Sequence, residues 1–152
     1  MKIAYTTPLE TVSAPRAGDA GYDLHAAAGA IVRPGTRECI SIGVILELPP
    51  GTVGLIRDRS GLARFDGVHV MGGVLDNSYR GIVSVILRNT SDKPFEVETG
   101  DRIAQMLILP VLTPALEIVA GVWEMERSTR GEQGFGSTGR AGALDAVLAT
   151  NG

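Results

Sequence analysis

The sequence lacks the features of several protein classes. Its 152 residues include a single cysteine, Cys39, so no disulfide can form within the chain, which is compatible with a reducing compartment. No apolar run approaches the ~20 residues needed to cross a bilayer, and Met1 and Lys2 lead into mixed polar sequence rather than a signal peptide. The net charge of −3 gives no electrostatic reason to expect nucleic-acid binding. A local basic pocket for a small polyanion is still compatible with this charge. We therefore expect a cytoplasmic protein that binds neither nucleic acid nor membrane.

Glycine and β-branched residues are abundant instead. Glycine accounts for 20 residues and proline for 8, and both interrupt long helices. Runs of strand length that are rich in Val, Ile and Thr recur between turn residues, at 36–48, 52–57, 80–88, 95–98, 102–112 and 116–119. This pattern predicts an all-β domain, a jelly-roll-like sandwich or barrel, with one short helix near residues 60–65.

One of these runs does not alternate between apolar and polar residues. Ile82, Val83, Val85, Ile86 and Leu87 place apolar side chains on both faces of the predicted strand. A strand with one solvent-exposed face should alternate between apolar and polar residues, so we expect the second face of this strand to be covered. Packing within the sandwich and a subunit interface would each cover it, and the sequence leaves both open.

The apolar pattern stops near Glu126. Residues 127–140 are glycine-rich and polar, and residues 141–152 form a tail of mostly small residues. Such a segment cannot by itself bury enough surface to offset the entropy lost on ordering. We therefore expect a β-barrel domain over residues 1–126 and a flexible C-terminal arm over residues 127–152.

The segment 72–81 combines reactive and turn-forming residues in a predicted hairpin. An isolated Asp76-Asn77 pair is most simply a plain β-turn, but the neighbouring Tyr79 and Arg80 and the preceding Gly72-Gly73 pair weaken that interpretation and leave a ligand-binding hairpin as the alternative. Small residues allow the backbone of such a hairpin to approach a planar ligand, and its amides can recognise hydrogen-bonding edges.

Two further segments carry polar groups suited to phosphate. Arg59, Ser60 and Gly61 stand at the start of the predicted short helix, where Ser60 is either only a cap or part of a phosphate site. Gln105 lies inside an otherwise apolar strand. A buried amide needs partners, so Gln105 is either a structural hydrogen-bonding residue or a ligand contact.

The arm contains a glycine pattern that could be mistaken for a dinucleotide-binding fingerprint. Residues 134–139 match G-x-G-x-x-G, but only 13 residues follow, too few for a βαβ unit. Glycines and hydroxyls flanked by Arg130 and Arg140 can still wrap a phosphate chain, and Phe135 could stack on a base. The alternative is a flexible terminus without a binding role.

Together these segments resemble the trimeric dUTP pyrophosphatase family, which has five short motifs in a fixed order. The matching segments are 17–26 (AGDAGYDLHA), 59–63 (RSGLA), 73–81, 100–106 (GDRIAQM) and 130–139. Each segment alone is a weak signal, whereas five in order over residues 17–139 are specific.

The resemblance implies a homotrimer that hydrolyses dUTP to dUMP and pyrophosphate with Mg²⁺, which limits uracil in DNA and supplies dUMP for thymidylate synthesis. By the same resemblance, Asp76 is the general base, Tyr79 packs under the deoxyribose, and Asp23 reaches the metal through water. Each active site draws on three subunits, and the arm arrives from the third. The implied substrate ligands are Arg59, Ser60, Gly61, Val70, Gly73, Tyr79 and Gln105 and, on the arm, Arg130, Phe135 over the uracil, Gly136, Ser137 and Thr138.

The sequence departs from the family at two positions and leaves two rivals. Val70 stands where some bacterial members have an asparagine that contacts uracil, and Gln133 stands where many members have glycine. A dCTP deaminase shares the fold, but it uses a glutamate and lacks the arm, so Asp76 and residues 130–139 argue against it. The second rival is a nucleotide-binding or regulatory protein for which catalysis is dispensable.

Overall fold

The computed structural model describes residues 1–129 and 131. The chain divides into two units, Met1–Thr113 and Pro114–Gly152. In the described part of the second unit, regular structure is limited to a single 3₁₀ turn, η2 (Val122–Glu124). The boundary predicted at residue 126 between a β-barrel domain and an arm remains a prediction.

Antiparallel strands make up the first unit, together with η1 (Leu62–Asp66), a short π-helical turn. The all-β architecture with one short helix is therefore as predicted, although Gly61 rather than Ser60 stands at the N-cap position. The strands are β1 (Lys2–Tyr5), β2 (Val12–Ser13), β3 (Tyr22–His25), β4 (Ala30–Val32), β5 (Arg37–Ser41), β6 (Val44–Glu47), β7 (Thr52–Arg57), β8 (Val68–Met71), β9 (Val74–Asp76), β10 (Ser84–Asn89), β11 (Phe95–Val97) and β12 (Arg102–Pro110).

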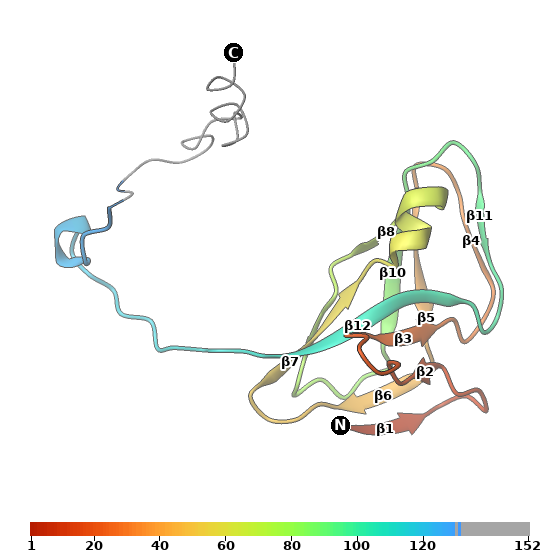
Figure 1. Ribbon diagram of the computed structural model, residues 1–152, viewed down its shortest axis with the longest axis horizontal. Coiled ribbons are helices and arrows are strands. Elements are labelled where there is room, and N and C mark those ends of the chain that lie inside the picture. The colour runs from red at the N-terminus through yellow and green to blue at the C-terminus, as the bar shows by residue number, and fades with distance from the viewer. Residues whose placement is uncertain (130, 132–152) are drawn as a thin grey trace, which may run out of the picture. The chain divides into compact units, whose positions relative to one another are not determined.

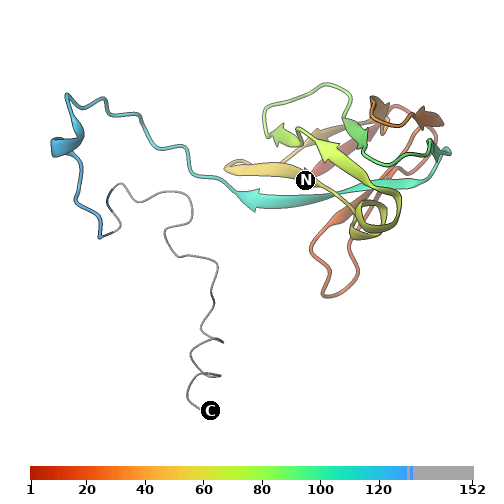
Figure 2. The same ribbon diagram turned by 90° about the horizontal axis from the view of Figure 1, so that it is seen from above.

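The long strand β12 lies at the centre of the largest sheet. This sheet has the order β2-β3-β12-β7-β9, and a second sheet has the order β5-β10-β8. Two pairs, β1 with β6 and β4 with β11, complete the first unit. Figure 1 shows β12 running beside β3 and β7, and Figure 2 shows the same strand from above.

The core lies between the two larger sheets and is filled by alternate residues of their strands. Leu24, Ile103 and Met106 are buried on the five-stranded sheet, and Val85 and Leu87 are buried on β10. The core residues of β10 follow the period of two, whereas Ile103 and Met106 of β12 lie three residues apart because the register of β12 against β3 shifts between Arg102 and Ala104.

The other face of β10 and of the loop before it is open in the single chain. Ile82 is 47% exposed and Ile86 is 37% exposed, whereas Val83 between them is buried. Packing within the described chain thus covers one face of this run and does not cover the second. A subunit interface at the second face remains a prediction.

Several predicted runs are longer than the observed strands, since 80–88 becomes Ser84–Asn89 and 102–112 becomes Arg102–Pro110, and two others differ more. The run 36–48 is divided into β5 and β6 at Gly43, whose φ of 63° lies in the left-handed region that favours glycine. Residues 116–119 do not form a strand, and Leu116 and Ile118 are each 97% exposed. β-branched composition alone does not make a strand, because the backbone also needs a ladder partner. Within the described residues, no helix has the length and apolar character required to cross a bilayer.

A buried asparagine closes one end of the three-stranded sheet. Asn89, at the end of β10, is fully buried. Its Nδ2 donates to the carbonyl oxygens of Val32 (2.9 Å) and Lys93 (2.7 Å), and its Oδ1 accepts from the backbone N–H (2.9 Å) and the hydroxyl (2.8 Å) of Ser91. One side chain therefore joins β10, β4 and the loop after β10.

We expect Asn89→Ala to lower the free energy of unfolding by about 2–4 kcal/mol, because it leaves several buried polar groups without partners. Urea unfolding at a fixed chain concentration measures this change. Asp92→Ala, in the same exposed loop, is the control and should stay within about 0.5 kcal/mol of the wild type. A similar small change for Asn89→Ala would contradict the assigned role.

Candidate active site

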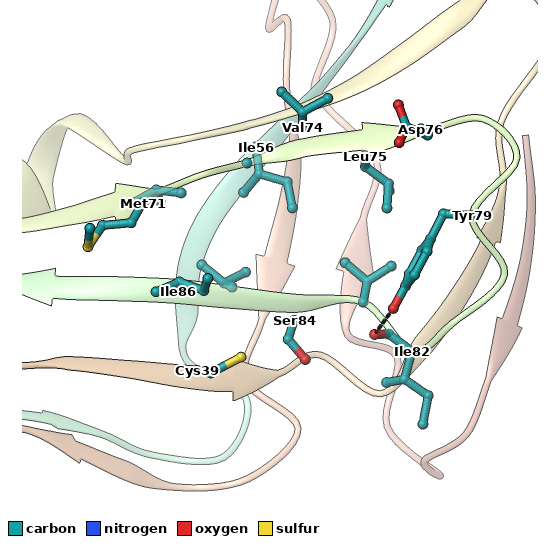
Figure 3. A pocket seen from close by; sticks show the side chains of 14 residues that line it. Cys39, Ile56, Met71, Val74, Leu75, Asp76, Tyr79, Ile82, Ser84 and Ile86 are labelled. Carbon is teal, nitrogen blue, oxygen red and sulfur yellow. Dashed lines mark hydrogen bonds between the residues drawn. The ribbon is translucent and has the colours of Figure 1, made fainter.

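A largely apolar pocket lies between β8, β9 and β10. We call it the hairpin pocket and define it by Val70, Gly73, Asp76, Tyr79 and Ile82. Asp76 is the one charged side chain among the described residues that line it, and it is exposed at the end of β9. Figure 3 shows the Tyr79 ring extending from the turn towards Ile82. The pocket therefore offers apolar walls, one aromatic ring and one carboxylate.

The turn after β9 is held by its own hydrogen bonds. The Tyr79 backbone N–H donates to the Asp76 carbonyl oxygen (3.1 Å), and the Tyr79 hydroxyl donates to the Ile82 carbonyl oxygen (3.2 Å). Arg80 Nη1 donates to the carbonyl oxygens of Asn77 (2.6 Å) and Tyr79 (2.8 Å). These bonds hold the turn and the Tyr79 ring next to the end of β9.

Gly73 brings the hairpin close to the neighbouring strand β7. Its carbonyl oxygen accepts from the Ile56 N–H at 2.7 Å, and its φ is 96°. A Cβ at this position would lie 2.5 Å from the Ile56 carbonyl oxygen. Both the backbone conformation and the space therefore require glycine here.

A second, polar pocket lies at the ends of β3, β7 and β12. We call it the arginine pocket and define it by Asp23, Arg59, Ser60, Arg102 and Gln105. Three arginines and two aspartates line it, together with Gly61 and His25, so its positive groups outnumber its carboxylates. It is therefore the part of the first unit best suited to a polyanion.

The arginines of this pocket are organised by one carboxylate. Asp23 Oδ1 lies 3.3 Å from Arg59 Nε, and Asp23 Oδ2 lies 3.5 Å from Arg102 Nη1. Arg59 Nη1 also donates to the Arg102 carbonyl oxygen at 3.1 Å. The two guanidinium groups are thus held side by side by a carboxylate whose side chain is 30% exposed.

The amide of Gln105 is fixed from two sides. Its Nε2 donates to the Asp58 carbonyl oxygen at 2.8 Å. Its Oε1 lies against Gly21, where a Cβ would come within 2.7 Å of that oxygen. Since Nε2 carries two hydrogens, one remains available to a ligand in the arginine pocket. The structural and ligand-binding interpretations of Gln105 are therefore compatible with each other.

A metal ion held only by protein groups does not fit this site. No group of three or more His, Cys, Asp or Glu side chains within residues 1–129 and 131 is arranged to hold one. Mg²⁺, however, keeps several waters and is often bound through one or two carboxylates together with substrate phosphates. Asp23, beside the arginine pair, fits an ion of that kind.

The predicted site residues fall into two pockets that share no lining residue. Val70, Gly73, Asp76 and Tyr79 line the hairpin pocket, whereas Arg59, Ser60, Gly61, Gln105 and Asp23 line the arginine pocket. Arg130, Phe135, Gly136, Ser137 and Thr138 lie outside the described residues. The first unit of one chain therefore does not bring the predicted residues into a single pocket.

Arg102 was not among the predicted site residues. Strand alternation places residues 102 and 105 on opposite faces, but the register of β12 against β3 shifts between Arg102 and Ala104. Both side chains then line the arginine pocket. Arg16, Asp19 and His25 were also missed, although Asp19 and His25 belong to the segment 17–26 that carries the resemblance.

Comparison with known proteins decides the family. A family model described as dUTPase matches residues 8–139. The chain belongs to the dUTPase family. The deoxyuridine 5′-triphosphate nucleotidohydrolase of Corynebacterium glutamicum is 44% identical over 126 residues, which cover 81% of this chain and 83% of that protein. The resemblance predicted from the five segments is confirmed.

Solved structures confirm the dUTPase fold. A mutant of the dUTPase of Staphylococcus bacteriophage 80alpha, solved with dUpNHpp, has a TM-score of 0.83 and 26% identity, and the match covers 91% of this chain and 97% of that chain. A mutant of the dUTPase of S. aureus phage phi11, described with a structural Mg(II) ion, has a TM-score of 0.74 and 22% identity, over 79% of this chain and 96% of that chain. At that identity the second likeness supports the fold alone.

The adjacent glycines 72 and 73 allow a matched test of the hairpin pocket. Both have positive φ, 71° and 96°, but a Cβ at Gly72 meets nothing within 4 Å, whereas one at Gly73 meets the Ile56 carbonyl oxygen. We expect Gly72→Ala to cost about 1–2 kcal/mol from backbone strain, and Gly73→Ala to cost about 2 kcal/mol more. Urea unfolding of the two variants measures the difference, and equal losses would contradict the close approach.

Proposed function

We propose that this protein hydrolyses dUTP to dUMP and pyrophosphate, with Asp76 activating the attacking water. The observation that carries the activity is the match of the dUTPase family model to residues 8–139, which include all five segments. The identity of 44% with the Corynebacterium glutamicum enzyme supports the same substrate.

Asp76 takes the role of general base. Its carboxylate is exposed at the end of β9 and lines a pocket of mostly apolar residues. It accepts a proton from water while the water oxygen attacks the α-phosphorus and the bond to the bridging oxygen of the β-phosphate breaks. Pyrophosphate leaves, and the hydroxyl from water remains on dUMP. A positioned base of this kind contributes about 10²–10⁴-fold to the rate.

The arginine pocket binds the triphosphate. Arg59 supplies charge, and the Gln105 amide and the Ser60 hydroxyl supply hydrogen bonds. Charge builds up on the phosphate oxygens as the anhydride bond breaks, so groups already fixed there stabilise the transition state. Since Asp23 holds Arg59 and Arg102 in the unliganded chain, the phosphates compete with Asp23 for the same guanidinium groups.

In this proposal Asp23 is the residue that would hold Mg²⁺ through water. When bound, the ion would neutralise charge on the triphosphate. The Asp23 carboxylate, whose Oδ1 lies 3.3 Å from Arg59 Nε, would orient it.

The hairpin pocket selects the nucleoside. The backbone at Gly73 reads the hydrogen-bonding edge of uracil, and Val70 borders the base. Tyr79, whose hydroxyl is engaged by the Ile82 carbonyl oxygen, packs under the deoxyribose and excludes a ribose 2′-hydroxyl. Mismatched polar groups discriminate by up to about 10⁴–10⁵, whereas a pocket too tight for one methyl adds roughly 10–200-fold.

The active enzyme is a homotrimer in which subunits share each site. Two observations support this proposal: the hairpin and arginine pockets share no lining residue, and Ile82 and Ile86 are exposed beside the hairpin pocket. In each site, the hairpin pocket of one subunit faces the arginine pocket of a second subunit. The arm of a third subunit brings Phe135 to the uracil and Arg130, Gly136, Ser137 and Thr138 to the phosphates.

A substrate panel tests the activity. The protein is incubated with dUTP, dCTP, dTTP and UTP, with Mg²⁺ or with EDTA, and both pyrophosphate and ammonia are measured. We expect pyrophosphate from dUTP with Mg²⁺ alone. Ammonia from dCTP would identify a deaminase, and tight binding of dUTP without turnover would identify a binding protein.

Asp76→Asn tests the general base. We expect the variant to lose about 10²–10⁴-fold in kcat and to bind dUpNHpp as the wild type does, because only the proton acceptor is removed. Steady-state kinetics and calorimetry measure the two quantities, with Asp92→Asn in an exposed loop as the control. An active Asp76→Asn variant would rule out this role.

Mixed trimers test the sharing of sites. Asp76→Asn subunits lack the base, and subunits truncated after residue 127 lack the arm. We expect each homotrimer to be inactive and mixed trimers to regain part of the activity, because some sites then combine an intact Asp76 with an intact arm. Tagged subunits purified in tandem show whether trimers have mixed, and no recovery in verified mixed trimers would count against shared sites.

A further inference from the structure

One residue of the first unit is bonded to the surroundings of both pockets. Asp58 lies between β7 and Arg59, and its Oδ1 accepts from the backbone N–H of Val70 at 2.6 Å. Its Oδ2 lies 3.0 Å from Nδ1 of His69, and its own carbonyl oxygen accepts from Gln105 Nε2 at 2.8 Å. Three segments that are distant in sequence therefore meet at residue 58.

We propose that Asp58 is a positioning residue that holds the phosphate-binding turn at residue 59 and the base-binding strand β8 in register. His69 is its partner. The proposal rests on the proposed function, because that function assigns the turn to phosphate binding and β8 to base binding. In a shared site the two elements of one chain contribute to different active sites, so a change at Asp58 in every subunit affects both halves of each site. Asp58 itself lines neither pocket and acts through Arg59, Gln105 and Val70.

On the arginine-pocket side, Asp58 fixes the backbone from which the phosphate ligands extend. Arg59 and Ser60 follow it directly, so the orientation of the Asp58 peptide sets where both side chains begin. The bond from Gln105 to the Asp58 carbonyl oxygen also orients the amide that faces the pocket. Movement of Asp58 would therefore displace at least three phosphate ligands together.

On the hairpin-pocket side, Asp58 anchors an edge strand. β8 is the terminal strand of the sheet β5-β10-β8, so its outer backbone groups have no neighbouring strand in that sheet. The Asp58 carboxylate takes the N–H of Val70, which lines the hairpin pocket three residues before Gly73. The bond therefore fixes the strand that leads into the hairpin.

The charge of Asp58 favours both bonds. Partial burial raises the pKa of Asp58, but the Val70 N–H, the bond and charge of His69 and the charge of Arg57 outweigh it, so the net pKa lies below the ordinary value of 3.8. At neutral pH the group is therefore an anion, which accepts charge-assisted hydrogen bonds.

The pair lies near the surface rather than in the core. The side chains of His69 and Asp58 are 45% and 34% exposed, and pairs of that exposure contribute little to global stability. Its removal should therefore change local geometry and substrate binding more than the free energy of unfolding.

Asp58→Ala is the principal test. We expect KM for dUTP to rise about tenfold, because the binding groups on both sides lose their register. We expect kcat to fall as well, because the displaced phosphate ligands also stabilise the transition state, although the pairing of β9 with β7 that holds Asp76 is intact. Asp92→Ala is the matched control and should keep both constants. A folded Asp58→Ala variant with KM within about twofold of the wild type would overturn the proposal.

Two substitutions of His69 test the partner. Asn at position 69 can place an N–H near the position of Nδ1, so we expect His69→Asn to keep KM close to that of the wild type. His69→Leu keeps the bulk without a donor, and we expect KM to rise about threefold. Equal KM values for the two variants would overturn the role of His69, and this comparison also decides the proposal if Asp58→Ala does not fold.

Failure of the proposed function gives a different result. A wild-type protein that releases no pyrophosphate from dUTP contradicts the activity without reference to Asp58. The affinity of the same variants for dUpNHpp, measured by calorimetry, then decides the positioning role, since it requires binding and no turnover. Affinity unchanged in both Asp58→Ala and His69→Leu would overturn it.

Discussion

The pairing of β12 with β3 on one side and β7 on the other is the constraint on which the arginine pocket depends. Gln105 pairs with Asp23 of β3 and with Arg57 of β7. The backbone pairing on the two sides of β12 therefore places these three residues next to one another across the sheet. Arg59 follows β7 by two residues and meets the Asp23 carboxylate there. The hydrogen bonds between the strands therefore position the residues of the arginine pocket, and the side chains of these residues supply its charge.

Strand β7 also explains how two separate pockets belong to one rigid frame. On its other edge, it pairs with β9, where Val53 stands opposite Asp76. The strand thus carries the turn of the arginine pocket at its end and supports the hairpin along its side. Substrate binding across subunits would then join surfaces that are each held firmly within their own chain. In the proposed trimer, this arrangement would let a shared site form without a large rearrangement of either half.

Much of the fold could be predicted from the sequence, because runs of β-branched residues between turn residues indicate strands. The grouping of Asp76 with Tyr79 could be predicted for the same reason, since both lie on one short hairpin. Other features depend on contacts that composition does not encode. Residues 116–119 have strand composition but do not form a strand, and Gly43 interrupts a run that looked continuous. The division of the site into two pockets comes from sheet order, which residue types alone do not specify.

The register shift between Arg102 and Ala104 makes the number of residues in β12 matter as much as their identity. If the same residues paired without this shift, strand alternation would turn Arg102 away from the face that Gln105 occupies. An insertion or deletion that leaves Arg102 and Gln105 on opposite faces of β12 should therefore be selected against, even where every individual substitution there is tolerated.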